Sequence, residues 1–391
     1  MSSIHWFFLF LFFMSVLLIF YSYVLFPVLL ALLTWRKKAA TAIKSNREYK
    51  VSILISVYNE EGIIGDKLES ILKLDYPIGN IEVLIGSDAS DDKTNQIVRS
   101  YSEKHSNIRL YEFNERRGKP AVINDLVALS GNDIIVLTDA NVLFEKGVIW
   151  GLVAHFADER VGLVGSNILN VGTTNHGISV QEMSYIEREN LIKYREGLLW
   201  GCMMGPFGGC YAIRRALFEK VPEGFLVDDF YISMKVLEKG YRCINDLESI
   251  CYEDVPDDIY QEYKRKARIS SGNFQNLKVF RKFLLKPYTG AGFCFISHKF
   301  LRWMTPFLIV ISFISLCILS FYDSRFLFLL VGEILLLASP LIDNIARRAG
   351  IHLRVLRFVA YFSFMNLALL RGFFRYLGGI DSGVWVPTKR K

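Results

Sequence analysis

The feature that most constrains this chain is a long apolar run near its N-terminus. Residues 6–35 contain no charged side chain, and Arg36, Lys37 and Lys38 follow directly. As a helix, this run would extend about 45 Å, more than the ~30 Å hydrocarbon core of a bilayer but too little for two spans. It lacks the leading positive charge and the small-residue cleavage site of a signal peptide. We therefore predict one tilted membrane span, with Pro27 as a candidate kink.

The C-terminal third is also apolar. Residues 303–322 and 326–342 each predict a span, whereas the shorter run 358–370 fits either an interfacial helix or a third C-terminal span. Basic and aromatic residues alternate over 258–286, which is typical of a helix in the membrane interface. The predicted segments are then an N-terminal transmembrane helix (1–36), a soluble domain (49–254), interfacial helices (255–300), a membrane region (301–377) and a basic tail (378–391).

Charge and composition support this division. The net charge of +7 arises beside the apolar segments and not in a basic patch of the soluble part, which argues against nucleic-acid binding. Arginine and lysine in these places hold loops in the cytosol. The six cysteines form no CxxC pair, so we expect reduced thiols in a cytosolic compartment. The chain is 52% hydrophobic, as expected of an integral membrane protein with a cytosolic domain.

Within the soluble segment, short β-type runs alternate with amphipathic helical runs. The strand candidates are residues 51–58, 81–87, 108–112, 133–139, 161–165 and 209–213, and helices are expected to start near residues 61, 91, 119 and 146. This alternation predicts an α/β fold, a mostly parallel sheet with helices on both faces. In such sheets the ligand site lies at the carboxyl ends of the strands.

Polar and charged residues follow the first strands of this predicted sheet. Asn59, Glu60 and Glu61 come after the first strand, and Asp88 ends the second, where it can accept hydrogen bonds from a base or a ribose. Any doubly wound sheet has polar strand ends, so each cluster alone is a weak signal. A third cluster, residues 116–119 (Arg-Arg-Gly-Lys), places basic groups at a turn, where they suit diphosphate charge or form a solvated surface.

A fourth cluster contains Asp139 and Asn141, on one side of an extended segment. Both side chains offer oxygen atoms to a divalent cation, and oxygen ligands suit Mg²⁺ or Mn²⁺. An ordinary polar turn is the alternative.

Taken in order, these clusters resemble the membrane-bound inverting family 2 glycosyltransferases of the GT-A fold, relatives of the hyaluronan, cellulose and poly-N-acetylglucosamine synthases. The resemblance covers residues 51–275. It implies that Val57, Glu60 and Asp88 bind the nucleotide base of a sugar donor, and that Lys119 lies near its diphosphate. Asp139 would stand for the first acid of the family's Asp-x-Asp element, and Asn141 stands where the second acid is usual. The resemblance also implies Mg²⁺ or Mn²⁺ as cofactor.

Two further stretches fit the same family. Residues 204–215 resemble its glycine-rich acceptor segment, which implies that Phe207, Gly208 and Gly209 contact the acceptor; glycines let the chain pass close to sugar rings. Asp228 and Asp229 resemble its acidic pair, in which the second acid is the general base. A helix cap would also explain two acids here, but a like-charged neighbour raises the pKa of a carboxylate toward a useful value.

One family element departs from the pattern. Processive members carry Gln-x-x-Arg-Trp, whereas this chain keeps Arg268 and has Ile269 in place of the stacking tryptophan. We therefore expect one or a few sugars to be transferred from a UDP-hexose or UDP-N-acetylhexosamine to a glycan or lipid-linked acceptor, forming a β-linkage at the cell membrane. Alternatives are a processive polysaccharide synthase, a polyprenyl-phosphate glycosyltransferase, and a nucleotide-sugar-binding scaffold or transporter. Transport is disfavoured because few polar residues lie in the predicted spans.

Overall fold

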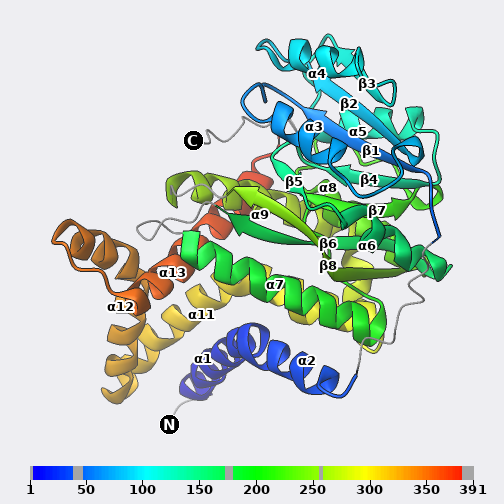
Figure 1. Ribbon diagram of the computed structural model, residues 1–391. Helices are drawn as coiled ribbons and strands as arrows, with labels where there is room; N and C mark the ends of the chain where they lie inside the picture. Colours follow the sequence, from blue (N-terminus) through cyan, green and yellow to red (C-terminus); the bar gives the residue numbers. More distant parts are fainter. Residues whose placement is uncertain (1–2, 38–46, 172–178, 255–258, 381–391) are drawn as a thin grey trace. The chain divides into compact units, whose positions relative to one another are not determined.

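The computed structural model describes residues 3–37, 47–171, 179–254 and 259–380, and the chain divides into two compact units (Figure 1). The sheet unit consists of Leu30–Asp257, Lys278–Cys294 and Ile380–Lys391. The helical unit consists of Met1–Leu29, Asp258–Leu277 and Phe295–Gly379. The basic tail predicted at 378–391 lies mostly outside the described residues.

The sheet unit is built on one mixed sheet, with the strand order β3-β2-β1-β4-β7-β6-β8-β5. The strands are β1 (Val51–Val57), β2 (Ile81–Asp88), β3 (Ile108–Phe113), β4 (Ile134–Thr138), β5 (Val142–Phe144), β6 (Val161–Val171), β7 (Cys210–Arg214) and β8 (Arg242–Asp254). β3, β2, β1 and β4 run parallel, and so do β6 and β8; β7 runs antiparallel to both of its neighbours, and β5 to β8. The predicted mostly parallel sheet is confirmed.

Helices cover both faces of this sheet. On one face, Ile53 and Ile55 of β1 belong to a buried core shared with α3 (Ile64–Leu72), α4 (Thr94–Ser102) and α6 (Val148–Ala154). On the other, α5 (Lys119–Leu129) lies so close to Gly86 of β2 that a Cβ there would collide with Val122. α8 (Asp228–Glu238) approaches Gly162 of β6 in the same way, and α7 (Ser179–Trp200) packs along β6 and β8. Because side chains alternate along a strand, central strands such as β1 and β4 are buried on both sides.

The six predicted strands all form, with ends shifted by a residue or two, except that β6 runs on to Val171. Two strands are additional to the prediction. β5 is only three residues long, and β8 carries polar residues such as Asn245 and Asp246 inside the fold. Neither shows the apolar run or the strict alternation by which a strand is recognised in a sequence.

One continuous helix of 32 residues starts in the helical unit. It consists of α1 (Ser3–Phe20), the π-helical turn η1 (Tyr21–Leu25) and α2 (Phe26–Thr34). Proline lacks an N–H and its ring displaces the carbonyl four residues earlier, so the wider turn before Pro27 relieves the clash. A second π-helical turn, η6 (Phe295–Phe300), lies against the first. The Ser22 hydroxyl donates to the Ser297 carbonyl (2.9 Å), a bond that helps to satisfy the main chain where the regular ladder is broken.

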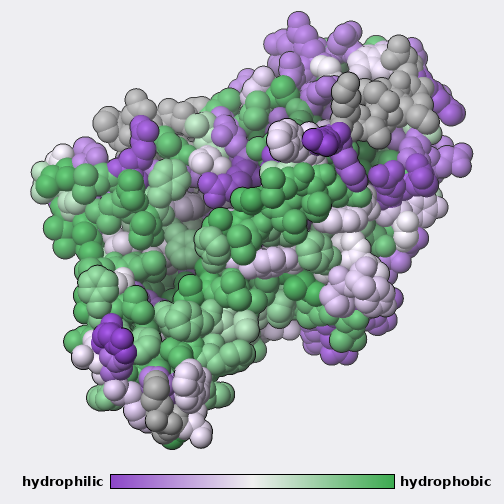
Figure 2. Space-filling model, turned by 90° about the horizontal axis from the view of Figure 1, so that it is seen from below, coloured by the Kyte–Doolittle hydropathy of each residue, from purple (hydrophilic) through white to green (hydrophobic). Residues whose placement is uncertain are grey.

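The remaining helices of this part of the chain are α9 (Ile259–Phe280), α10 (Gly290–Cys294), α11 (Leu301–Tyr322), α12 (Arg325–Arg348) and α13 (Arg354–Leu377). By length and composition, four helices of the described chain can cross a membrane: Ser3–Thr34, Gly290–Tyr322, Arg325–Arg348 and Arg354–Leu377. The last extends past the apolar run 358–370 at both ends, so its length fits a third C-terminal span. Exposed side chains such as Phe10, Phe328 and Leu335 are hydrophobic, and hydrophobic surface predominates on the face shown in Figure 2. Such a surface requires an apolar environment.

Candidate active site

Polar residues from separate elements meet at the carboxyl edge of β1, β2 and β4. Asp88 is the last residue of β2, and Asp139 directly follows β4. Gly209 precedes β7, and since β7 runs antiparallel to β4 it arrives at the same edge. Asp228 and Asp229 begin α8. The edge at which α/β folds bind ligands therefore carries most of the residues that the sequence singled out.

The loops after β1 and β2 hold each other in unusual conformations. Asn59 (φ 51°) and Ala89 (φ 58°) adopt left-handed backbone angles that non-glycine residues seldom take. The side chain of Asn59 supports the arrangement, because its Oδ1 accepts the N–H of Asp91 (3.0 Å). The neighbouring Glu60 donates its backbone N–H to Thr94 Oγ1 (2.8 Å). Such outliers cluster at functional sites, where the surrounding bonds maintain them.

Asp88 anchors the basic turn. Its buried carboxylate accepts the N–H of Arg117 at Oδ1 (2.8 Å) and the N–H of Gly118 at Oδ2 (2.8 Å). Gly118 has φ 87°, an angle that suits glycine, and α5 starts at the next residue, Lys119. The contact of Asp88 with a nucleotide base stays a prediction, while its hydrogen bonds give it a part in positioning Lys119.

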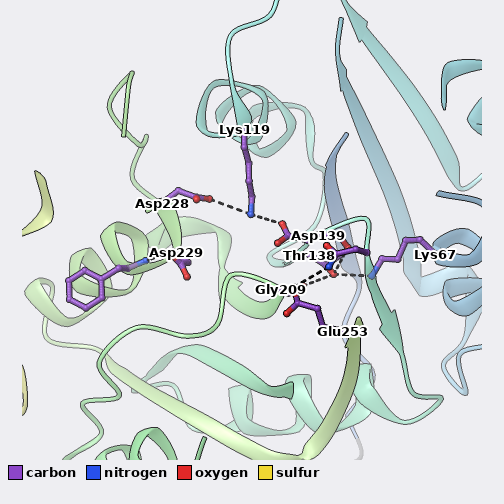
Figure 3. A network of polar contacts seen from close by, with 10 residues as sticks. Lys67, Lys119, Thr138, Asp139, Gly209, Asp228, Asp229 and Glu253 are labelled. Carbon is purple, nitrogen blue, oxygen red and sulfur yellow. Dashed lines mark hydrogen bonds and ion pairs between the residues drawn. The ribbon is translucent and has the colours of Figure 1, made fainter. Parts of the chain in front are cut away.

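Lys119 lies between carboxylates of two other elements (Figure 3). Its Nζ is 2.6 Å from Oδ1 of Asp139 and 4.0 Å from Oδ2 of Asp228. Burial alone would lower the pKa of this ammonium, but the negative charges of Asp139 and Asp228 raise it above its usual value. A permanently charged lysine is therefore fixed beside the first acid of the expected metal element.

A buried lysine braces the segment that carries Asp139 and Asn141. Lys67, on the core-facing side of α3, donates to Thr138 Oγ1 (2.9 Å) and to the carbonyl of Val142 (2.5 Å), the residues on either side of the 139–141 triplet (Figure 3). Its ammonium also lies 3.4 Å from the centre of the Phe144 ring. Burial lowers the pKa of Lys67 to about 8. The sequence analysis did not select this residue.

The same segment is tied to the glycine-rich stretch. The carbonyl of Gly209 accepts both the Thr138 hydroxyl (2.8 Å) and the Asp139 N–H (3.1 Å). A Cβ at Gly209 would lie 2.9 Å from Val142, so a side chain there would force the two segments apart. Gly209 of the predicted acceptor segment and Asp139 of the predicted metal element are thus directly hydrogen-bonded.

Asp229 has the electrostatic character of a general base. Burial, followed by the charge of Asp228, raises the pKa of Asp229 to about 6. Its Oδ1 accepts its neighbour's N–H, that of Phe230 (2.8 Å), and its other oxygen borders Gly208, where an added Cβ would lie only 3.1 Å away. The glycine therefore leaves room next to the carboxylate, as a reacting hydroxyl would need.

Phe207 lies on the same glycine-rich stretch, with Lys193 of α7 above it. The Lys193 ammonium is 3.2 Å from the centre of the Phe207 ring, a cation–π contact of a largely buried lysine. Lys193 also acts electrostatically on Asp229, lowering its pKa against the larger effect of burial. This lysine was another residue that the sequence analysis did not single out.

Asn141 has an acidic neighbour that the sequence analysis also missed. The amide Nδ2 of Asn141 donates to Oε1 of Glu253 (3.1 Å), near the end of β8. The pairing of Val142 with Glu253 across β5 and β8 places the two side chains together. A polar residue near the end of a long strand was the available signal, but β8 itself was not predicted.

The other predicted site residues lie elsewhere. Val57 has its side chain in the apolar core (1% exposed), so only its main chain is available to a nucleotide. Arg268 belongs to the helical unit, on α9, and its catalytic part stays a prediction. Among the described residues, no group of three or more His, Cys, Asp or Glu could hold a metal ion. A cation at this edge would need amide or ligand oxygens beside the carboxylates.

Comparison with known proteins agrees with this geometry. Residues 52–221 match the sequence model of "Glycosyl transferase family 2". The "Probable glycosyltransferase YdaM" of Bacillus subtilis (strain 168) is 27% identical over 235 residues, which are 57% of this chain and 55% of that protein. The "Poly-beta-1,6-N-acetyl-D-glucosamine synthase" of Staphylococcus aureus (strain MSSA476) is 24% identical over 236 residues, 58% of this chain and 55% of that protein. The chain spans about half the length of these curated relatives.

A solved structure shares the fold. The mannosyltransferase PcManGT from Pyrobaculum calidifontis, in complex with GDP-Man and Mn²⁺, superposes with a TM-score of 0.69 and 21% identity, over 94% of this chain and 99% of that chain. The sheet unit therefore has a GT-A-type fold, and residues 52–221 are similar to glycosyl transferase family 2 domains. This match and the two relatives support glycosyltransferase chemistry in the sheet unit.

The first prediction concerns the two hydrogen bonds that Lys67 donates to Thr138 and Val142. Lys67→Met removes two buried hydrogen bonds to the ends of the 139–141 triplet but keeps the side-chain volume. Bonds from a charged donor contribute about 1.5–3 kcal/mol each, so amide hydrogens of residues 139–144 should exchange at least about tenfold faster. Hydrogen-exchange mass spectrometry of the full-length protein measures the exchange rate of these amide hydrogens.

The control is Lys73→Met, which replaces an exposed lysine at the end of the same helix. It should leave exchange in 139–144 unchanged. Equal protection of that segment in wild type and Lys67→Met would show that Lys67 does not brace it.

Proposed function

We propose that this protein is an inverting glycosyltransferase that moves a sugar from a nucleotide-sugar donor to a hydroxyl of a glycan or lipid-linked acceptor. The observation that carries the proposal is Asp229, a carboxylate with a raised pKa beside a glycine that leaves space for an acceptor. The family domain and the ligand-binding edge of the sheet support a nucleotide-sugar as donor. A UDP-hexose or UDP-N-acetylhexosamine is our specific proposal, and the named synthase relative favours it.

The donor site would use the loops after β1 and β2 for the nucleoside. Glu60 and Asp88 lie at these strand ends, and the backbone of Val57 lies beside them. The diphosphate would then meet Lys119, whose ammonium is already oriented by Asp139. Charge that develops on the leaving diphosphate is stabilised by such preorganised groups without reorganisation. Arg268 is proposed as a second positive charge for the departing nucleoside diphosphate.

The residues present fit a divalent cation. Asp139 offers a carboxylate and Asn141 an amide oxygen, since the Asn141 nitrogen is engaged by Glu253. Oxygen donors of this kind suit Mg²⁺ or Mn²⁺, and the likeness to a mannosyltransferase solved with Mn²⁺ agrees. When bound, the cation would neutralise charge on the diphosphate oxygens.

The reaction we propose is a single displacement. An acceptor hydroxyl beside Gly208 passes its proton to Asp229 as its oxygen forms a bond to the anomeric carbon. The bond from that carbon to the diphosphate oxygen breaks, and its electron pair leaves with the nucleoside diphosphate. Attack from the face opposite the leaving group inverts the anomeric configuration, so that an α-linked donor gives a β-linkage.

The second prediction tests the base. Asp229→Asn should lower kcat by about 10³-fold, within the usual range for loss of a general base, while UDP binding persists. Burial holds the folded pKa of Asp229 above its unfolded value, so the stability it contributes at low pH is lost as pH rises through about 6. At pH 7 the neutral asparagine should therefore unfold no earlier than wild type. Turnover with purified acceptor, UDP titration calorimetry and thermal unfolding measure the three effects.

The pH profile of the wild type gives a further check. Asp229 acts only when ionised, so activity should fall as pH drops through about 6. Glu238→Gln, an exposed acid at the other end of α8, should keep the wild-type rate and profile. Near-normal turnover by Asp229→Asn would remove this residue from the mechanism.

The third prediction concerns product length. Ile269 stands where processive relatives are expected to carry a stacking tryptophan, and it offers no aromatic face for a sugar. We therefore propose that one or a few sugars are added per acceptor. Gel sizing after a timed reaction with excess acceptor should show short products on many acceptors. Long chains formed early, with most acceptor unextended, would favour the processive synthase instead.

The fourth prediction concerns location. Four apolar helices indicate a membrane protein. We propose that it lies in the plasma membrane, and that the basic residues 36–38 and 347–348 keep the adjoining segments in the cytosol. A cysteine introduced at the exposed Ser106 of the sheet unit should react with an impermeant maleimide only after cells are broken. Ser3→Cys, near the opposite end of the first span, should react in intact cells. Labelling at position 106 from outside would reverse the proposed orientation.

A further inference from the structure

Glu253 is a carboxylate at the active-site edge that none of the steps above uses. Its Oε1 accepts the amide of Asn141 at 3.1 Å, and the β5–β8 pairing fixes it there. Figure 3 shows Glu253 among the residues of the same polar network as Gly209 and Asp139. It reaches this position from a strand more than a hundred residues further along the chain. The contact therefore arises from the fold and not from any local motif.

Within the described part of the chain, no basic side chain forms an ion pair with Glu253. Asp139, in contrast, is paired with the Lys119 ammonium at 2.6 Å. Glu253 is partly buried, and an amide is only a dipole, so the hydrogen bond from Asn141 leaves a net negative charge. A partly exposed carboxylate with this charge is available to a hard divalent cation.

The orientation of Asn141 points to the same conclusion. Because its nitrogen donates to Glu253, its carbonyl oxygen must lie on the other side of the planar amide. An amide oxygen, the second oxygen of Glu253 and a carboxylate oxygen of Asp139 are all hard donors of the kind that Mg²⁺ and Mn²⁺ prefer. Glu253 thus brings a carboxylate next to the position where the resemblance places the second acid.

We propose that Glu253 supplies the second carboxylate of the divalent-cation site, in place of the acid that Asn141 lacks. The inference rests on the cation of the proposed function and adds a residue to its site. Asn141 then has two parts: it orients Glu253 through its nitrogen and offers its own oxygen. The two acids of the Asp-x-Asp element are then Asp139, in the loop after β4, and Glu253, on β8.

The fifth prediction tests this assignment by binding and not by turnover. UDP is titrated into the full-length protein with and without MnCl₂, and the ratio of the two dissociation constants gives the cation-dependent tightening. GDP is titrated in parallel. Loss of one carboxylate ligand should reduce this ratio at least about tenfold in Glu253→Gln, the range seen when groups that support a metal site are removed. Asp254→Asn, the adjacent acid on the opposite side of β8, should keep the wild-type ratio.

A compensating double variant gives a second check on Glu253 as a cation ligand. In Asn141→Asp/Glu253→Gln, the carboxylate is moved to position 141, and the ratio should return to within about threefold of wild type. If Glu253 only oriented Asn141, Glu253→Gln would keep the wild-type ratio, because the glutamine amide oxygen can still accept the Asn141 N–H. An unchanged ratio in Glu253→Gln, with a clear ratio in wild type, would overturn this inference and leave the proposed function standing. If MnCl₂ does not tighten UDP binding to the wild type, both this inference and the cation of the proposed function are wrong.

Discussion

The arrangement of the active-site edge depends on one ammonium between carboxylates. Lys119 bonds Asp139 and lies 4.0 Å from Asp228, whose neighbour Asp229 is the proposed base. At 4 Å and an effective dielectric constant of 20, two unit charges interact by about 4 kcal/mol. Without that ammonium, acids from β4 and α8 would repel each other across the edge. With it, Asp229 keeps a pKa that allows it to ionise near neutral pH.

That ammonium is itself positioned by the main chain. Asp88 accepts the N–H groups of Arg117 and Gly118, and the positive φ of Gly118 lets the chain turn into α5. On the opposite side, the Gly209 carbonyl accepts hydrogen bonds from Asp139 and Thr138. From within the core, Lys67 donates hydrogen bonds to the residues on either side of the 139–141 triplet. The proposed reacting groups are therefore supported by hydrogen bonds from β2, α3 and the segment before β7, which favours a fixed geometry.

Most of the sheet and its site edge could be predicted from the sequence because each signal there is local. β1, β2 and β4 are short apolar runs, and a polar residue follows each one. Lys67 is different: its partners lie more than seventy residues away. A signal existed, since Lys67 occupies an apolar position between Ile64 and Ile71 of α3, but such a lysine is indistinguishable from one that extends to solvent along an apolar surface. Glu253 depends on a strand pairing that no local pattern encodes.

The balance of charge at this edge explains why the site needs more than its lysine. Asp139, Asp228, Asp229 and Glu253 bring four carboxylates to one region, and Lys119 alone contacts two of them. A nucleoside diphosphate adds further negative charge, so it would be repelled unless protons or cations entered with it. The raised pKa of Asp229 removes part of that charge near pH 6, but a base must be ionised to act. The proposed divalent cation would lower the charge around the donor while Asp229 stays ionised toward the acceptor. Acids outnumber the fixed lysines Lys119 and Lys193 at this edge, which favours a metal-bound diphosphate over a free one.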